Sequence, residues 1–266
     1  RLMADGTVLV ATEKGVYHQQ QGHLAPWNGT AGWVVRDLVD DGDNGWVVAA
    51  DDGVHWLHAD GRRQHLLPGE RVDAVRHDAS DALWLSLSAG RLVRLAPGKT
   101  ERIAVPGQVS PALLIDREGL VWAGSTDGLF RIDEGAARGL TMEDGLGSDY
   151  LRALIQSDNG DVWIGHSEGL NRMRGDLISA VRLLPGTGRD ASVLALAARG
   201  QGVWAGTYNK GVLGVDEAGR VLQQISLPGT VQPLIRSLLS EADGSLWIGS
   251  SEGLYHHQRG KLHHYG

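Results

Sequence analysis

The chain alternates short apolar runs with turns rich in glycine and acidic residues, and it repeats nearly the same phrase several times. The segment "DNGDVWIGHSEGL" at 158–170 returns as "DGSLWIGSSEGL" from Asp243 and as "REGLVWAGSTDGL" from Arg117. In each copy the apolar runs are about five residues long and lie between turn residues, which is typical of β-strands joined by hairpins. The pattern therefore predicts a series of small antiparallel sheets.

Each repeat is defined by a closing glycine and by a large apolar residue, the anchor, that precedes it by six or seven positions. The closing glycines are Gly15, Gly53, Gly90, Gly128, Gly169, Gly211 and Gly253. The anchors are Leu9, Val47, Trp84, Trp122, Trp163, Trp204 and Trp247. The anchors are separated by 38, 37, 38, 41, 41 and 43 residues, a period that fits one small sheet per repeat. Seven repeats account for the whole chain.

The copy at 151–183 predicts four strands in sequence. The strands are "LRALIQS", "DVWIGHS", "LNRMR" and "LISAVRL", with "DNG", "EG" and "GD" as the turns between them. The pair Asn159–Gly160 predicts a two-residue hairpin turn, in which both residues adopt a positive φ. Each repeat is therefore expected to be a four-stranded antiparallel meander.

Such a sheet is apolar on both faces, and a single isolated sheet would leave both faces exposed to water. At about 25 cal/mol per Å², each exposed face would leave several kcal/mol of burial energy unrealised. Twisted sheets that stack around an axis bury both faces and leave only short edges. We therefore predict an all-β, seven-bladed β-propeller of four-stranded antiparallel blades over residues 1–266. The anchor tryptophans are expected between neighbouring blades, and the closing glycines at positions where a side chain would obstruct the backbone.

The first copy begins close to its anchor, because Arg1 stands only eight residues before Leu9. We therefore expect the first blade to lack part of its innermost strand. We also expect the chain to be a segment of a longer receptor.

Composition and charge narrow the function classes. The formal net charge is −7 and the basic residues are scattered, which argues against nucleic acid as a partner. No apolar stretch approaches 18 residues, so we expect no membrane contact by this segment. The absence of cysteine excludes disulfides and thiolate zinc sites, but it does not distinguish one compartment from another.

The stretch "SDYLRALIQSDNGDVWIGHSEGLNRM" at 148–173 resembles the two-component-regulator propeller repeat. The likeness is close around Trp122, Trp163 and Trp247, looser around Trp84 and Trp204, and faint in the first two copies. The resemblance implies a periplasmic sensor, the extracytoplasmic part of an inner-membrane receptor that forms a homodimer. A histidine kinase or diguanylate cyclase would then lie outside this chain, after an immunoglobulin-like module and a membrane helix.

A second family, the streptogramin lyases, is similar only in the repeat period and the tryptophan. The third strands here read "GLFRI", "GLNRM" and "GLYHH", in place of that family's "N-K-I-G-R-I". This leaves a propeller lyase or hydrolase, with His166 and a cation at its site, as one alternative. A passive scaffold that docks a protein partner is another.

Candidate ligand-binding residues follow from the expected fold. In a propeller, the innermost strands begin at the face where the turns between second and third strands also lie, and ligands usually bind there. The residues expected at this rim are Arg36, Arg152, Arg236, Asp149, His166, Glu168 and Tyr208, with Ser148, Asp73, Asp127, Asn209 and Glu252 nearby. The three arginines all stand eleven residues before their anchors and would suit an anionic or sugar-acid ligand. The alternative is that each arginine pairs with an acidic residue of the adjacent blade.

Metal binding and catalysis find less support. The chain has 11 histidines, and His256 and His257 are expected to face His263 and His264 across a hairpin. They have no cysteine or carboxylate at metal-ligand spacing, so we favour a solvated edge. No catalytic motif is present, and His166 occurs in one copy only. We therefore predict a non-catalytic chain without metal or cofactor, whose partner is a small molecule, an oligosaccharide or a protein.

Overall fold

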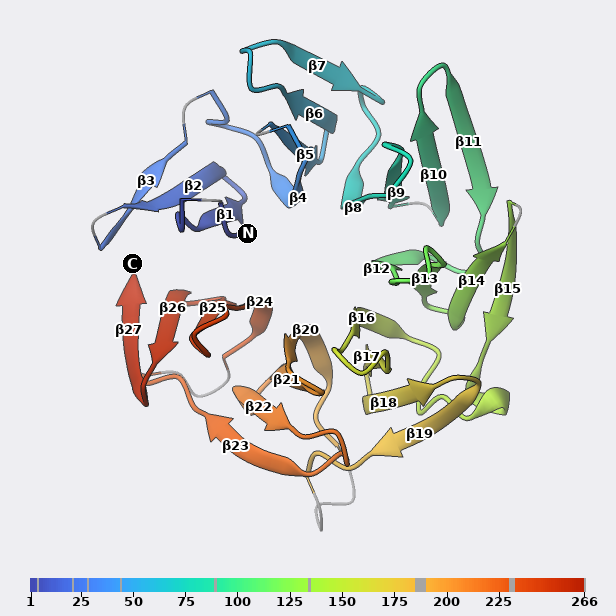
Figure 1. The fold of residues 1–266 in the computed structure, drawn as a ribbon, viewed down its shortest axis with the longest axis vertical. Coiled ribbons are helices and arrows are strands. Elements are labelled where there is room, and N and C mark those ends of the chain that lie inside the picture. Colours follow the sequence, from blue (N-terminus) through green and yellow to red (C-terminus); the bar gives the residue numbers. More distant parts are fainter. Residues whose placement is uncertain are drawn as a thin grey trace. The chain divides into compact units, whose positions relative to one another are not determined.

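The computed structural model describes residues 1–3, 5–20, 22–27, 29–43, 45–88, 90–133, 135–184, 190–229 and 233–265. These residues form seven antiparallel sheets that follow one another along the chain (Figure 1). In every sheet each strand pairs with its neighbours in chain order. The fold is an all-β, seven-bladed β-propeller, as the repeat predicted.

Blades 1 to 4 take up the first half of the chain. Blade 1 contains β1 (Leu9–Thr12), β2 (Gly15–Gln20) and β3 (His23–Pro26). Blade 2 contains β4 (Val35–Asp40), β5 (Trp46–Ala50), β6 (Gly53–Leu57) and β7 (Arg63–Leu66). Blade 3 contains β8 (Val72–His77), β9 (Leu83–Leu87), β10 (Arg91–Ala96) and β11 (Lys99–Ala104). Blade 4 contains β12 (Val109–Ile115), β13 (Val121–Ser125), β14 (Leu129–Asp133) and β15 (Ala136–Leu140).

Blades 5 to 7 follow a short 3-10 helix, η1 (Met142–Asp144). Blade 5 contains β16 (Leu151–Gln156), β17 (Val162–His166), β18 (Gly169–Arg174) and β19 (Leu177–Val181). Blade 6 contains β20 (Val193–Arg199), β21 (Gly202–Thr207), β22 (Val212–Val215) and β23 (Val221–Ile225). Blade 7 contains β24 (Ile235–Ser240), β25 (Leu246–Ser250), β26 (Gly253–Gln258) and β27 (Lys261–Tyr265).

Blade 1 is the one three-stranded sheet among the described residues. In place of a first strand it has a single bridge between Leu2 and Val8, and the amide of Leu9 donates to the carbonyl of Arg1 at 2.7 Å. The expectation that blade 1 lacks part of its innermost strand is therefore confirmed.

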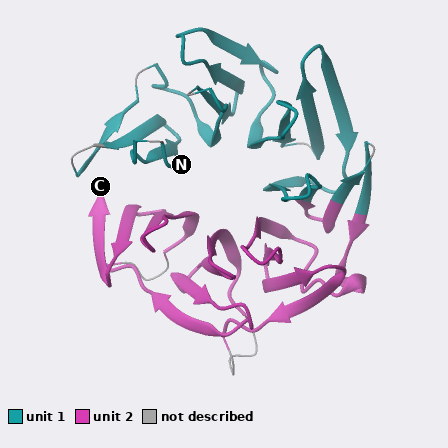
Figure 2. Ribbon diagram, in the orientation of Figure 1, with its two compact units in different colours: residues 1–123, 131–138 teal, residues 124–130, 139–266 magenta. Residues whose placement is uncertain are grey.

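The chain divides into two compact units (Figure 2). Unit 1 comprises residues 1–123 and 131–138, and unit 2 comprises residues 124–130 and 139–266. Within unit 1 the first strand of each blade packs against that of the next, β4 against β8 and β8 against β12. Within unit 2 the same contacts join β16 to β20 and β20 to β24. Each unit thus repeats one packing arrangement.

The anchor tryptophans are buried between neighbouring blades. Trp163 is 0% exposed and packs in one cluster with Val203 and Leu213 of blade 6. Trp204 is 5% exposed and packs with Leu246 and other residues of blade 7. Burying about 150–250 Å² of indole at about 25 cal/mol per Å² stabilises each contact by roughly 4–6 kcal/mol. The predicted role of the tryptophans is confirmed for these two blades.

A polar residue six positions before the anchor holds the indole and the preceding turn together. In blade 4, Oδ1 of Asp116 accepts hydrogen bonds from the amides of Glu118 and Leu120, and Oδ2 accepts from Nε1 of Trp122 at 2.8 Å. Asp78 holds Trp84 in the same way at 2.9 Å. One carboxylate therefore closes the turn and orients the indole.

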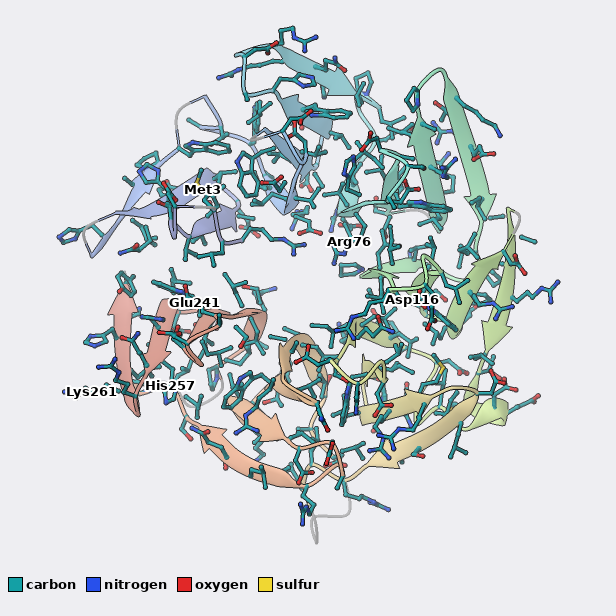
Figure 3. The ribbon with its side chains drawn as sticks, in the orientation of Figure 1. Met3, Arg76, Asp116, Glu241, His257 and Lys261 are labelled. Carbon is teal, nitrogen blue, oxygen red and sulfur yellow. The ribbon has the colours of Figure 1, made fainter. Side chains whose placement is uncertain are left out.

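Unit 2 uses other residues at this position. In blade 5, Oγ of Ser157 accepts from Nε1 of Trp163 at 2.9 Å. In blade 7 the position is Glu241 (Figure 3), whose carboxylate accepts from the hydroxyl of Ser245. Within the described ranges, Nε1 of Trp247 has no hydrogen-bond partner. The partner of the anchor indole is thus not conserved within the repeat.

The closing glycines lie where a side chain would collide with the fourth strand. Gly128 has φ 129°, and a Cβ there would lie 2.5 Å from the carbonyl oxygen of Leu140. Gly53 has φ 139°, and its Cβ would lie 2.6 Å from the carbonyl oxygen of Leu66. The prediction for these glycines is confirmed, because only glycine combines this φ with this close approach.

The predicted turn at Asn159–Gly160 is wrong in type. Ser157 and Asp161 close the turn through a 2.9 Å backbone hydrogen bond, which leaves three residues at its tip, and only Gly160 has a positive φ. The side-chain oxygen of Asn159 accepts from the amide of Asp161 and from the hydroxyl of Ser157. These local bonds favour the longer turn over a two-residue one.

Candidate ligand site

The start of each first strand and the turn after the second strand lie at the same end of a blade, which we call the first-strand end. One backbone hydrogen bond joins them in five blades, with the turn amide as donor. The donor and acceptor pairs are Asp51 to Val34, Ser88 to Arg71, Ser167 to Tyr150, Tyr208 to Ser192, and Ser251 to Leu234. The candidate residues of the sequence therefore gather at the first-strand ends of their own blades.

Arg36, Arg152 and Arg236 occupy one structural position. Each is the residue at which the register between the first and second strands of its blade shifts by one. The same irregularity occurs at Asp73 in blade 3 and at Leu194 in blade 6. Such a β-bulge leaves one residue unpaired and redirects its side chain, which is common beside binding sites.

Arg36 is neutralised within its own blade. Its guanidinium donates to both carboxylate oxygens of Asp51, Nε to Oδ1 at 2.6 Å and one terminal nitrogen to Oδ2 at 2.8 Å. The hydrogen bond to Asp51 raises the pKa of Arg36, and the hydrogen bond from Arg36 lowers the pKa of Asp51. The expected alternative, a partner on the adjacent blade, is therefore wrong for Arg36. Asp51 lies in the turn between β5 and β6.

Arg152 and Arg236 form no ion pair within the described ranges. The guanidinium carbon of Arg152 lies 4.6 Å from the ring centre of Tyr150, and no described residue forms a hydrogen bond with the buried Nε of Arg152. The side chain of Arg236 is exposed. Two of the three equivalent arginines thus keep hydrogen-bond donors that no carboxylate of the described residues uses.

Two tyrosines at the first-strand ends of blades 5 and 6 are solvent-exposed. Tyr150 is 43% exposed and directly precedes β16. Tyr208 is 48% exposed and lies in the turn between β21 and β22. Both rings therefore offer apolar surface and a hydroxyl to a ligand.

The acidic candidates of blade 5 make local contacts. Oδ1 of Asp149 accepts from the amide of Met142 at 2.8 Å, and so holds the loop that contains η1. The amide of Glu168 donates to Nδ1 of His166 at 3.2 Å, and the Glu168 side chain is exposed. Oγ of Ser148 lies 2.9 Å from Oγ of Ser167. Asp149 thus has a structural contact, whereas Glu168 remains open to solvent.

The residues that the sequence placed near the rim, other than Ser148, lie on blades 3, 4, 6 and 7. Asp73 pairs with Arg71 at 2.8 Å, and the carbonyl of Glu252 accepts from His264 at 3.0 Å. Asp127 and Asn209 are exposed in their turns.

His166 is enclosed. It is 3% exposed, and among the residues that the structure describes its Nε2 has no hydrogen-bond partner. A Cβ on Gly147 would lie 2.9 Å from this Nε2, so the ring packs directly against backbone. Burial lowers the pKa of His166, although Asn171, Glu168 and Asp190 act to raise it. The imidazole is therefore neutral at pH 7 and closed to solvent.

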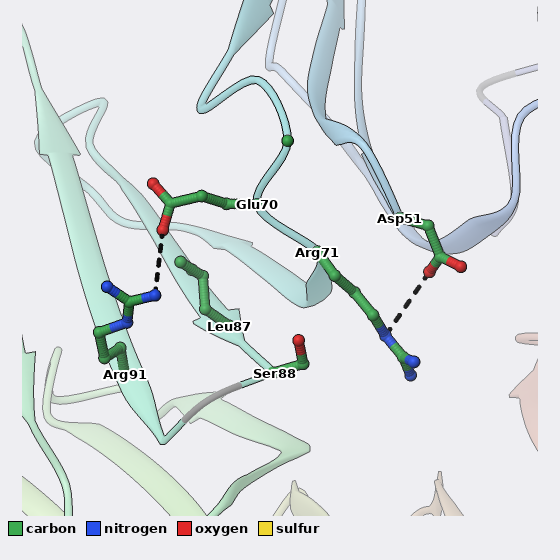
Figure 4. Close-up of a pocket in the computed structure, with 7 residues that line it drawn as sticks. Asp51, Glu70, Arg71, Leu87, Ser88 and Arg91 are labelled. Atoms are coloured by element: carbon green, nitrogen blue, oxygen red, sulfur yellow. Dashed lines mark ion pairs between the residues drawn. The ribbon is translucent and has the colours of Figure 1, made fainter.

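A cavity of about 250 Å³ opens at the first-strand ends of blades 2 and 3 (Figure 4). Its charged lining consists of two ion pairs, Arg71 with Asp51 at 3.5 Å and Arg91 with Glu70 at 3.5 Å. Ligand pockets usually measure about 300–1,000 Å³. This cavity is small and its charges compensate one another, so it is a weak candidate for binding an anion.

A second cavity, of about 680 Å³, lies in unit 2 at the opposite ends of the blades. It is lined by turn residues between first and second strands and by Arg199, Trp204, Gln223, Glu241 and His257. Figure 3 labels Glu241 and His257 on blade 7. The guanidinium carbon of Arg199 lies 4.9 Å from the indole centre of Trp204. This cavity was not predicted from the sequence, because each of its lining residues on its own has the pattern of a turn or strand position.

The histidines of β26 and β27 do not gather as expected. His256 lies opposite His263, but His257 lies opposite Leu262 and His264 opposite Tyr255. Within the described ranges, the one group of three potential metal ligands is Asp52, His55 and His65 of blade 2.

Solved structures of other proteins have a similar fold. No family model and no curated protein matches the sequence. Catalytically inactive virginiamycin B lyase from Staphylococcus aureus, solved with quinupristin, is 13% identical with a TM-score of 0.73, over 87% of this chain and 83% of that one. The WD40 β-propeller domain of Doa1 is 13% identical with a TM-score of 0.69, over 93% and 87%.

A third similar structure is the extracellular domain of a proposed one-component system from B. thetaiotaomicron. It is 14% identical with a TM-score of 0.50, and the match covers 99% of this chain but 48% of that one, so this chain spans about half of that domain. At such identities these likenesses establish the β-propeller fold. In the described part of the chain, no helix has the length and apolarity needed to span a membrane.

Proposed function

We propose that this chain is the non-catalytic, ligand-sensing propeller of an extracytoplasmic signalling receptor, and that it binds an anionic small molecule or oligosaccharide at the first-strand ends of unit 2. One observation carries the proposal. Arg152 and Arg236 occupy the bulge position of Arg36 but have no carboxylate partner among the described residues. The receptor assignment is supported by the repeat resemblance and by the fold shared with the extracellular domain of a proposed one-component system.

The chemistry of these arginines selects the ligand class. A guanidinium presents planar N–H donors that match a carboxylate in a bidentate manner. A hydrogen bond to a charged group contributes about 1.5–3 kcal/mol. The exposed rings of Tyr150 and Tyr208 supply flat apolar surface for a sugar ring. A sugar acid therefore satisfies both kinds of residue.

Signal output would then depend on rigid-body movement of the propeller. Blades packed through buried tryptophans resist internal bending, so a bound ligand would change the placement of two receptor protomers. This mechanism includes the homodimer and the periplasmic location that the repeat resemblance implies.

The test is isothermal titration of uronic-acid oligosaccharides, with neutral oligosaccharides of equal length as the reference. We expect binding only to the acidic series, and a loss of about 10–100-fold in affinity for Arg152→Ala and for Arg236→Ala. Arg36→Ala is the matched control, because its guanidinium is already paired with Asp51. Equal losses in all three variants, or none in the first two, would contradict the proposal.

One observation favours a second candidate function. Among the described residues Nε2 of His166 has no hydrogen-bond partner and the ring is neutral, as a general base must be. Because Nδ1 accepts from the amide of Glu168, the proton of the neutral ring lies on Nε2, and the ring can act as a base only after this hydrogen bond is broken. A hydrolase at His166 would open a cyclic depsipeptide such as quinupristin by adding one water, which mass spectrometry detects as a gain in mass. A lyase would open it by elimination without a change in mass, which chromatography detects as a new linear product. Because His166 is 3% exposed, we expect no turnover by the intact chain or by His166→Ala.

A third possibility is a passive scaffold that binds only a protein partner. It predicts no affinity for any oligosaccharide and no effect of Arg152→Ala. The titration above therefore separates it from the ligand-sensing proposal.

A further inference from the structure

Two histidines of blade 2 lie directly opposite each other on adjacent strands. His55 on β6 pairs in register with His65 on β7, so their side chains project from the same face of the sheet. The two imidazoles are stacked, with ring centres 4.3 Å apart and planes 8° from parallel. The hairpin thus brings two nitrogen ligands together from positions ten residues apart.

Asp52, in the turn before β6, adds a carboxylate to this pair. Its Oδ1 lies 2.9 Å from Nε2 of His55, and its Oδ2 lies 4.0 Å from Nε2 of His65. One ligand atom from each of the three residues lies within 4.8 Å of the other two.

Neighbouring residues position the ligands. The indole of Trp33 stacks on His55 with ring centres 3.8 Å apart, and His55 is 9% exposed. A Cβ on Gly53 would lie 2.8 Å from Nε2 of His65, so glycine keeps the space beside this nitrogen open. One ligand is therefore held by packing, whereas the His65 side chain is 42% exposed and its Nε2 donates to the backbone carbonyl of Asp52 at 3.1 Å, a hydrogen bond that metal binding would replace.

We infer that Asp52, His55 and His65 form a binding site for a divalent transition-metal ion, with Zn²⁺ as the ion that best matches the ligands. This site goes beyond the proposed function and does not depend on it. Two imidazoles and one carboxylate select zinc-like ions over Mg²⁺ or Ca²⁺, which prefer oxygen ligands. Water would complete a tetrahedral set at the fourth position.

The distances fit this ion after a small movement. Zinc bonds of 2.0–2.2 Å place tetrahedral ligands roughly 3.3 Å apart. The present separations of 2.9 Å and 4.0 Å lie on either side of that value. Parallel rings direct their lone pairs along parallel lines, so binding requires His65 to turn out of its stack with His55.

The test is titration of the chain with ZnCl₂ by calorimetry. We expect one zinc per chain, and at least a tenfold loss of affinity in His65→Ala and in Asp52→Asn. Cobalt substitution gives a second readout, because a four-coordinate Co²⁺ site absorbs visible light strongly and His65→Ala should abolish that band. Circular dichroism checks the fold, and Asp52→Asn keeps the size of its side chain.

The matched control is His263→Ala, because His263 is also an exposed fourth-strand histidine opposite a third-strand histidine, His256. We expect it to leave zinc affinity and stoichiometry unchanged. The inference is overturned if the chain binds no zinc, if His65→Ala binds zinc like the unmodified chain, or if His263→Ala causes the same loss.

Discussion

Blade 2 in unit 1 and blades 5 and 7 in unit 2 share one backbone geometry at the first-strand end but differ in charge. All three carry an arginine at the bulge. Four residues after the anchor, blade 2 has Asp51, whereas blades 5 and 7 have Ser167 and Ser251. These three residues donate the same backbone hydrogen bond, so their side chains start from equivalent places. A single residue therefore decides whether the bulge arginine is neutralised.

The residue after the bulge shows a second difference of the same kind. In blade 2 it is Asp37, which accepts from Arg76 of blade 3 at 2.6 Å and contacts Arg1 at 3.5 Å. Burial raises the pKa of Asp37, but the charges of Arg76 and Arg1 outweigh this effect and hold the pKa below its usual value. Blades 5 and 7 have Ala153 and Ser237 here.

The difference between blade 2 and blades 5 and 7 shows that the shared backbone does not by itself define the candidate ligand site. Unit 1 uses its carboxylates to compensate arginines and to join neighbouring blades. Unit 2 leaves two equivalent arginines uncompensated within the described residues. Ligand binding therefore depends on side chains carried by a common backbone, as in other propellers.

The largest expected effect is on the interblade pair of unit 1. Asp37→Ala leaves Arg76 without its carboxylate, and removing one partner of a largely buried pair should lower the free energy of unfolding by about 3 kcal/mol. Asp37 is 20% exposed in its side chain. Ser237→Ala, at the equivalent position of blade 7, should change the free energy of unfolding by less than about 0.5 kcal/mol. Urea denaturation measures both, and equal effects would remove the contrast.

The anchor tryptophans provide the next test. Trp84 and Trp247 are 8% and 6% exposed, so Trp→Phe removes a similar buried area from each. Only Trp84 has a carboxylate partner, Asp78, for its indole N–H. We expect Trp84→Phe to destabilise the chain by about 2 kcal/mol more than Trp247→Phe does. Matching urea midpoints for the two variants would refute this.

Exchanging the residues at the turn should exchange which bulge arginine has a carboxylate partner. Ser167→Asp gives Arg152 a carboxylate and should weaken binding of a uronic-acid oligosaccharide about tenfold, or about 1.4 kcal/mol. Asp51→Ser frees Arg36 and should leave unit 2 binding unchanged. Titration of both variants against the unmodified chain measures this, and an unchanged affinity in Ser167→Asp would count against the site.

The smallest effect concerns acid stability. Burial raises the pKa of Asp78, but hydrogen bonds from Ser80 and Trp84 outweigh it and lower the pKa to about 2. A carboxyl with a lowered folded-state pKa stabilises the fold above its ordinary value of 3.8, and this stability is lost as the pH falls from there to about 2.

Asp78→Ser imitates Ser157 of blade 5 and removes this dependence. The difference in unfolding free energy between the unmodified chain and the variant should shrink by about 1 kcal/mol between pH 5 and pH 2, after allowance for solvent screening. Urea denaturation at several pH values measures it. A difference that stays constant with pH would show that the Asp78 carboxylate adds nothing.

The fold could be predicted from the sequence because the repeated residues reflect backbone requirements directly. The anchors mark burial between blades, and the closing glycines mark positive φ beside a carbonyl oxygen. The turn at Asn159–Gly160 was predicted incorrectly, because side-chain hydrogen bonds of Asn159 select a longer turn. The zinc ligands of blade 2 were missed, although the hairpin register of His55 and His65 was the signal that could have revealed them.

By itself, the sequence determined the number of blades, their strands and the equivalence of Arg36, Arg152 and Arg236, because these features repeat along the chain at a regular period. Only the tertiary structure decided which arginine is neutralised and that His166 is enclosed. These outcomes depend on distances between side chains that are far apart in the sequence, and electrostatic and burial energies change steeply over a few ångströms.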